Sequence, residues 1–117
     1  MPFRHVPPSF WSDSRVGALS EPARLLLLCM NNLTDCEGRF RVDLRYLRAQ
    51  AFAFDARPKG DRDMQGMVDS LIRADLIESY EADGLVIGRI PYENPFPPMS
   101  QYVRRREGEE SRLPGRP

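Results

Sequence analysis

The chain has few of the residues on which metal sites, disulfide frameworks and much acid–base catalysis depend. Its 117 residues include one histidine, His5, and two cysteines, Cys29 and Cys36. This small set fits none of the ligand spacings of zinc or redox sites. We therefore expect no metal and no cofactor, and we expect both cysteines to be free thiols in a reducing cytoplasm.

The patterns of common enzymes, membrane proteins and secreted proteins are also missing. There is no Ser/His/Asp set, no glycine-rich phosphate loop and no carboxylate pair beside a base, so we expect neither an enzyme nor a small-molecule substrate. The longest apolar run, Leu25 to Met30, is far shorter than the ~20 residues of a membrane-spanning helix. The first residues show no charged region followed by an apolar core, so no secretory signal is expected.

Proline marks both ends of one expected domain. Residues 1–9 contain Pro2, Pro7 and Pro8 and are predicted to form an extended N-terminal arm. Residues 10–92 have the length and hydrophobic content of a single globular domain. Residues 93–117 are rich in proline and then in charge, so we expect a disordered tail.

Three helices are predicted from their first residues and apolar spacing. Ser20 is expected to cap the first, with Glu21 and Pro22 in its first turn. Asp43 is expected to cap the second and Asp61 the third. The second helix has the expected inner residues Leu44, Leu47, Ala51 and Phe54. The third has Met64, Met67, Val68, Leu71 and Ile72, at the clearest helical spacing in the chain.

The segment after the third helix predicts a β-hairpin. Two short β-rich runs, Leu76 to Tyr80 and Leu85 to Ile90, are joined through Asp83-Gly84, a strong turn signal. A short strand is also expected at Arg39 to Val42. The order helix, helix, helix, hairpin predicts an α+β fold, a winged helix-turn-helix in which the hairpin is the wing.

The chain resembles the N-terminal winged-helix domain of bacteriophage and prophage replication initiators, the replisome-organiser or DnaD-like group. The resemblance covers about residues 9–92. It is carried by Phe10-Trp11-Ser12-Asp13, the Leu19-Ser20 helix start with Ala23-Arg24-Leu25-Leu26, the Asp35 to Arg39 turn, Leu47, Phe52-Ala53-Phe54-Asp55, Leu71, Leu76-Ile77, Tyr80, Asp83-Gly84 and Ile90-Pro91. It implies DNA binding in replication initiation, in the cytoplasm of a bacterial host cell.

Two features depart from that family. Its members usually continue into a second domain that engages the host helicase-loading machinery, whereas this chain ends in a short charged tail. Many members also place basic residues on or beyond the wing, whereas here Glu78, Glu81 and Asp83 surround its tip.

The chain carries no net charge, so its local charge distribution decides what it attracts. Between Arg39 and Arg62 there are seven basic residues and three acids, an excess of four. Arg41, Arg45 and Arg48 recur at spacings of four and three, which would place them on one face of a helix. We expect a phosphate-binding edge in this region. We call it the basic edge: Arg41, Arg45, Arg48, Arg57, Lys59 and Arg62.

The third helix would present Arg62, Gln65, Gly66, Asp69 and Arg73 to a ligand. Gln65 suits an adenine edge, and Arg62 or Arg73 suits a guanine edge. Gly66 is either tolerated in the helix or permits close backbone approach. The opposing interpretation is a solvated face on which Asp69 and Arg73 form an ordinary i, i+4 pair. Arg104, Arg105 and Arg106 form a second basic element in the tail.

Two functions follow from these patterns. The first is a small winged-helix DNA-binding protein of phage or mobile-element type that binds double-stranded DNA in replication initiation or related regulation. The alternative is a protein-interaction or oligomerisation module that contacts itself, a replisome protein or a host protein and binds little DNA. The arginines favour the first function, and the neutral charge and acidic wing favour the second.

Overall fold

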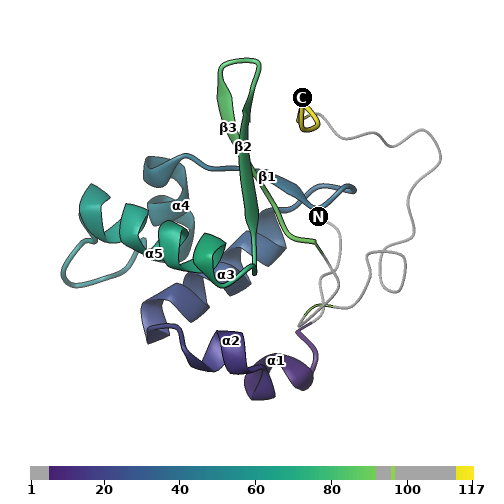
Figure 1. The fold of residues 1–117 in the computed structure, drawn as a ribbon. Coiled ribbons are helices and arrows are strands. Elements are labelled where there is room, and N and C mark those ends of the chain that lie inside the picture. Colours follow the sequence, from purple (N-terminus) through teal and green to yellow (C-terminus); the bar gives the residue numbers. More distant parts are fainter. Residues whose placement is uncertain (1–5, 92–95, 97–112) are drawn as a thin grey trace.

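Helices and one antiparallel sheet make up the part of the chain that the computed structural model describes, residues 6–91, 96 and 113–117. The elements run α1 (Ser9–Ser12), α2 (Ser14–Gly17), α3 (Glu21–Leu33), β1 (Arg39–Arg41), α4 (Leu44–Ala51), α5 (Asp61–Arg73), β2 (Glu78–Ala82) and β3 (Leu85–Arg89). The β2–β3 hairpin projects from the helices at one end, and α1 and α2 lie at the other (Figure 1). The α+β class predicted from the sequence is confirmed.

Two of the three predicted helix caps are confirmed. The Ser20 side chain accepts a hydrogen bond from the Ala23 amide, and the Asp43 carboxylate accepts from the amides of Arg45 and Tyr46. The prediction for Asp61 is wrong, because the N-cap of α5 is Gly60 and Asp61 is the first helical residue. The Asp63 carboxylate accepts from the Gly60 amide at 3.3 Å, so an acid does stabilise the first turn from inside the helix.

Polar contacts fix the short helix α2 against the longer elements. The Asp13 carboxylate accepts from the amides of Arg15 and Val16 at the start of α2. Partial burial would raise the pKa of Asp13, but hydrogen bonds from the Arg15 side chain and from both amides outweigh it and lower that pKa. At the other end of α2, the Arg24 guanidinium donates to the carbonyls of Val16 and Gly17, at 3.1 and 3.0 Å. These bonds join α2 to α3.

The core forms where α3 packs against α4 and α5. Leu26 and Met30 of α3 are fully buried, as are Leu47 of α4 and Leu71 of α5. The predicted inner position of Phe54 is wrong, because its side chain is fully exposed (102%). The helix ends at Ala51, so the helical spacing no longer applies to residue 54, and Phe52 enters the core instead.

The sheet has the strand order β1-β3-β2, with both pairs antiparallel. The predicted hairpin turn is confirmed, since Asp83 and Gly84 both have positive φ values, 52° and 76°. Two successive left-handed residues are the signature of a type I′ turn, which matches the twist of the strands that it joins. The short strand β1 pairs only with the inner half of β3, from Ile87 to Arg89.

A glycine lets an aromatic ring pack directly onto the sheet. Phe40 of β1 lies opposite Gly88 of β3, and the Phe40 ring is almost completely buried. A Cβ atom at Gly88 would overlap this ring, with two ring carbons at 2.7 and 2.9 Å. The close approach fixes β1 to the hairpin on the face that joins the core.

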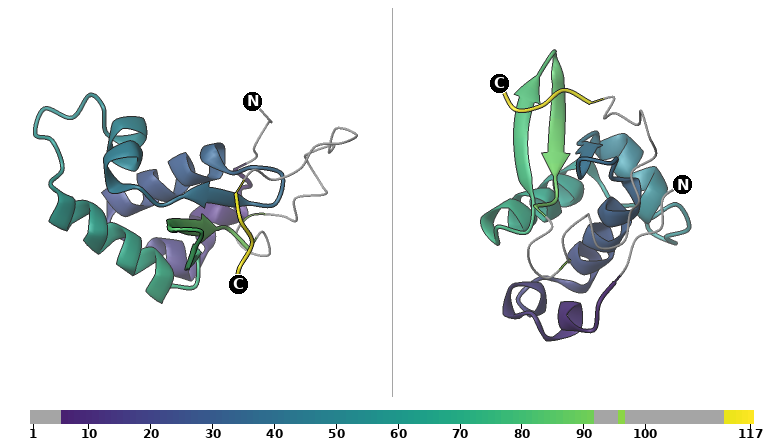
Figure 2. Two further views of the ribbon diagram at one scale, coloured as in Figure 1. Left: turned by 90° about the horizontal axis from the view of Figure 1, so that it is seen from above. Right: turned by 90° about the vertical axis from the view of Figure 1, so that its right-hand side faces the viewer.

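The C-terminal residues that are described lie against the domain, which differs from the expected disordered tail. The Phe96 ring is buried, 5.6 Å from the Phe10 ring between centroids. Residues 113–117 lie beside the hairpin in both views of Figure 2, where they are yellow. The rest of the predicted tail, and residues 1–5 of the predicted N-terminal arm, lie outside the described residues; Ser9 already belongs to α1.

Substitution of Gly88 by alanine should destabilise the fold. The added methyl group has no space beside the buried Phe40 ring, so we expect a loss of about 1–3 kcal/mol in the free energy of unfolding, as for other overpacked cores. Urea unfolding followed by circular dichroism measures the loss. Val86→Ala on the same strand is the control, because Val86 is partly exposed and should cost less. Equal losses in the two variants would contradict this account of Gly88.

Candidate nucleic-acid interface

The structure divides the basic edge into exposed side chains and internally bonded ones. Arg45 of α4, Arg57 of the following turn and Arg62 of α5 are exposed, and no ion pair involves any of the three within the described residues. Arg41 is also exposed, but it is the last residue of β1. The prediction that Arg41 shares a helical face with Arg45 and Arg48 is therefore wrong, because α4 begins only at Leu44.

Arg48 is bonded to the turn that precedes α5. Its Nη1 atom lies 2.7 Å from Asp61 Oδ1 and donates to the Lys59 carbonyl at 3.3 Å. The arginine thus connects α4 to the first residue of α5 and to the turn between them. This contact gives Arg48 a positioning role, and its role in phosphate binding stays a prediction.

Lys59 is held in a similar way. Its ammonium group lies 3.0 Å from Asp55 Oδ2 and 5.3 Å from the centroid of the Phe52 ring. A cation over an aromatic face is attracted to it, so this contact folds the turn back onto the core. Three acids lie between Arg39 and Arg62 in the sequence. Two of them, Asp55 and Asp61, are thereby paired with Lys59 and Arg48. The charge that remains exposed is that of Arg41, Arg45, Arg57 and Arg62.

The outward face of α5 has the predicted composition with one different pairing. Gln65, Gly66 and Arg73 are exposed, and Arg73 is the last residue of the helix. The Gln65 amide donates to Asp69 Oδ1 at 2.9 Å. The opposing interpretation paired Asp69 with Arg73, whereas the structure shows Asp69 bonded to Gln65, which orients the Gln65 side chain along the helix.

An open groove of about 640 Å³ lies between the α2–α3 turn and α5. One wall comes from the start of α3, and the other comes from the exposed side of α5 around Gly66. Nothing lies within 4 Å of the position that a Cβ atom would occupy at Gly66, so the helix backbone is accessible there. The groove is lined by Ala18, Leu19, Ser20, Pro22, Lys59, Arg62, Asp63, Gly66, Met67 and Ser70.

The acids of the hairpin differ in their surroundings. Glu78 lies opposite Arg89, with 3.4 Å between Oε2 and Nη1, and Arg116 Nη2 lies 4.0 Å from the same oxygen. Glu81 and Asp83 are exposed near the tip. The uncompensated negative charge is therefore confined to the outer end of the hairpin.

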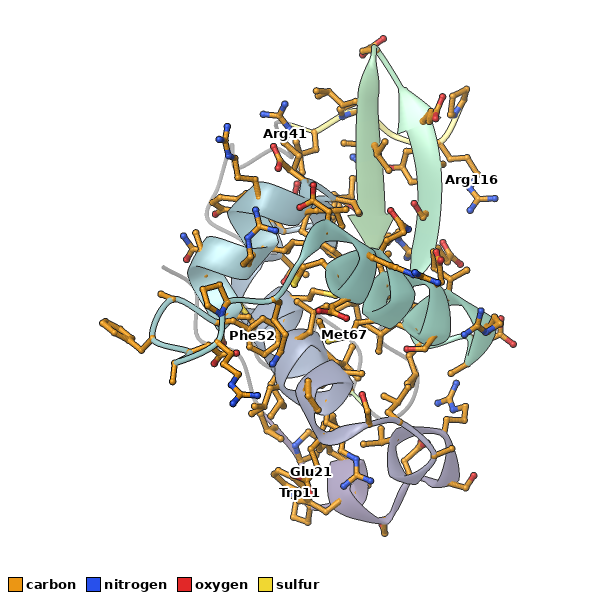
Figure 3. All side chains as sticks on the ribbon, turned by 90° about the vertical axis from the view of Figure 1, so that its left-hand side faces the viewer. Trp11, Glu21, Arg41, Phe52, Met67 and Arg116 are labelled. Carbon is orange, nitrogen blue, oxygen red and sulfur yellow. The ribbon has the colours of Figure 1, made fainter. Side chains whose placement is uncertain are left out.

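Two exposed aromatic side chains near the basic edge were missed by sequence reasoning. Phe54 is fully exposed in the turn before α5, and Tyr46 is partly exposed on α4. The end of α4 at Ala51, which decides the exposure of Phe54, has no strong breaker in the sequence before Pro58. A third exposed aromatic, Trp11, lies at the opposite end of the molecule from Arg41 (Figure 3).

The remaining predicted site residues and sites are reported briefly. Arg104, Arg105 and Arg106 lie outside the described residues. Within the described residues, no group of three or more histidine, cysteine, aspartate or glutamate side chains is arranged to hold a metal ion. Burial raises the pKa of the Cys29 thiol, which keeps it protonated at neutral pH. None of the described helices has both the length and the apolar character to cross a membrane.

Comparisons with known proteins identify no relative. The chain matches no protein-family model, and no similar protein was found among curated proteins or solved structures. The resemblance to phage replication initiators therefore rests on the sequence motifs alone.

Substitution of Gly66 by alanine should show whether this glycine serves ligand binding or is only tolerated in the helix. The methyl group meets no neighbouring atom, and alanine favours a helix more than glycine does, so we expect a gain of about 0.5–1 kcal/mol in the free energy of unfolding. If a ligand approaches the backbone closely at this point, the same variant should bind it more weakly. Thermal unfolding and a DNA titration on one sample measure both effects. Unchanged binding by a stabilised variant would show that Gly66 is only tolerated.

Proposed function

We propose that the chain is a winged-helix DNA-binding protein in which α5 enters the major groove and the basic edge contacts the phosphates. The order of elements, with α3, α4 and α5 followed by the β2–β3 hairpin, is compatible with this fold. In such proteins the second helix and the turn before the recognition helix lie near the DNA backbone. Here α4 carries Arg45, the turn carries Arg57, and Arg62 lies in the first turn of α5 itself.

The observation that carries the proposal is the exposure of these three arginines beside acids that are already paired. Asp55 and Asp61 would repel a phosphate if their charges were uncompensated, but each lies within 3.0 Å of its cationic partner, Lys59 or Arg48. Arg45, Arg57 and Arg62 therefore extend from an edge whose remaining charge is positive. Arginine at such an edge suits phosphate contacts well, because its planar guanidinium presents several donors at once.

Base reading would come from the outward face of α5. In this proposal Gln65 leaves Asp69 and makes a bidentate contact with adenine, while Arg62 or Arg73 contacts guanine. The biological role that we propose is replication initiation or related regulation in a phage or mobile element, within the bacterial cytoplasm. That role is supported by the motif resemblance alone.

Removal of Arg45 and Arg57 together should weaken DNA binding for all sequences. Each lost phosphate contact should reduce the slope of log affinity against log salt by about 0.9. Fluorescence anisotropy with duplex DNA at several salt concentrations measures this slope. Arg48→Ala is the matched comparison, because it removes the same charge from an internally bonded residue. It should lower the free energy of unfolding and change the slope less.

An unchanged slope in the Arg45→Ala/Arg57→Ala variant would mean that these arginines are only part of a solvated surface. A larger change of slope from Arg48→Ala than from the double variant would contradict the division of the basic edge into exposed and internally bonded residues.

A second candidate, a protein-interaction module, is favoured by different observations. The exposed Phe54 and Tyr46 give apolar contact area of the kind that is enriched in protein interfaces. The tip of the hairpin carries Glu81 and Asp83, and charges of this sign repel phosphates within a Debye length of about 10 Å at 0.1 M salt. In this candidate the hairpin meets a protein surface and DNA is bound weakly.

Reversal of Glu81 and Asp83 to lysine should separate the two candidates. If the hairpin tip only repels DNA, we expect stronger non-specific DNA binding and an unchanged mass in solution. If the acidic tip contacts a protein, self-association or partner binding should fall instead. Light scattering and the same anisotropy titration measure the two results. Loss of sequence-specific DNA binding would show that the hairpin reads DNA, contrary to both expectations.

A further inference from the structure

One face of the sheet contains a buried apolar residue that does not belong to the main core. Ile87 is fully buried (0% exposed), yet it lies outside the cluster that includes Phe40. It is paired with Arg41 on one side and with Tyr80 on the other. Directly paired residues point to the same face, and successive residues alternate between faces. Ile87 therefore lies on the outer face of the sheet, which we define by Arg39, Glu78, Tyr80 and Ile87.

The described C-terminal residues lie along this outer face. The Leu113 carbonyl accepts a hydrogen bond from Arg39 Nη1 at 3.1 Å, and the Pro114 carbonyl accepts from the Tyr80 hydroxyl at 2.7 Å. Two successive carbonyls are thus bound by donors from β1 and β2, the two outer strands of the sheet. The contact holds an extended backbone in one position across the sheet.

The next two residues extend the match. Arg116 lies 4.0 Å from Glu78 Oε2, with its guanidinium 5.5 Å from the centroid of the Tyr80 ring. A Cβ atom at Gly115 would lie 3.2 Å from Arg39 Nη2, so a side chain there would crowd the arginine that binds Leu113. Figure 3 shows Arg116 beside the hairpin. The two carbonyls therefore meet hydrogen-bond donors, and the Arg116 cation meets an acid and an aromatic ring. The absence of a side chain at Gly115 leaves room for Arg39.

A second donor of Arg39, its Nε atom, takes no part in these contacts with the segment. This atom is buried and has no hydrogen-bond partner among the described residues. A buried donor without a partner is costly, and this one stays unpaired while residues 113–116 occupy the face, so Arg39 binds the segment through Nη1 and not through Nε. Proline-containing segments present carbonyls freely, because proline has no N–H and favours an extended backbone.

We propose that the outer face of the sheet is a peptide-binding site for the Leu-Pro-Gly-Arg sequence at 113–116, which occupies it in cis. Residues 97–112 join this segment to Phe96, which is buried in the core, and a tether of this length gives an effective concentration in the millimolar range. A segment with only millimolar intrinsic affinity is then bound for much of the time. The site does not depend on DNA binding.

The test follows the Gly115 amide in the full-length, ¹⁵N-labelled chain. The reference for the released state is the synthetic peptide Leu-Pro-Gly-Arg-Pro in the same buffer. In the unaltered chain we expect the Gly115 resonance to differ from that of the peptide. Tyr80→Phe removes one hydrogen bond, so the released population should rise roughly 2- to 10-fold. Tyr46→Phe is the matched control, because the Tyr46 hydroxyl lies on α4, and it should leave Gly115 unchanged.

Three results would overturn the proposal. One is a Gly115 resonance at the free-peptide position in the unaltered chain, and another is an equal shift in the Tyr80→Phe and Tyr46→Phe variants. The third is a bound fraction that rises with protein concentration, which would assign the occupant to a second copy. Glu78→Gln provides an independent variant if Tyr80→Phe disturbs the fold. It removes the negative charge that attracts Arg116, so the released population should rise here as well. Unlabelled peptide at millimolar concentration should also displace the segment.

Discussion

The burial of one helix face organises the rest of the molecule. Leu26, Leu27 and Met30 of α3 are inaccessible to solvent, and α4 and α5 both pack against this helix. Each such side chain contributes about 1.5–3 kcal/mol when it is fully buried. Because α4 and α5 are positioned by the same helix, the turn between them has a fixed span. The positions of the exposed arginines follow from that span.

Polar contacts then determine which charges face outward. Arg48 and Lys59 bind the acids and the carbonyl of the turn before α5, and an ion pair of this kind at the surface contributes little to stability. Its main effect is on geometry, since it fixes the turn and removes two negative charges from the edge. The candidate interface therefore depends on two groups of basic residues: Arg48 and Lys59, which bind within the chain, and the exposed arginines, which are available to a ligand.

Local signals in the sequence predicted most of the fold. Ser20 and Asp43 identify helix starts by their side-chain acceptors, and Asp83-Gly84 identifies the hairpin by its backbone preference. The predictions that proved wrong concern features that depend on tertiary contacts. Phe54 is exposed because α4 ends early, and Arg48 pairs with a residue 13 positions away. The contact of residues 113–117 with the sheet joins parts of the chain more than 30 residues apart, a distance at which spacing patterns carry no information.

The pairing of β1 has a mechanical consequence for the hairpin. Its inner part is held from both sides, since β1 pairs with Ile87, Gly88 and Arg89 and the Val42 amide donates to the Val86 carbonyl. The outermost pair, Ala82–Leu85, belongs to two strands alone. Two-stranded ribbons twist more than wider sheets. We therefore expect the hairpin to be stiffer at its root, where three strands pair, than at its tip. At its root, the buried Leu76 and Ile77 connect the hairpin to the end of α5.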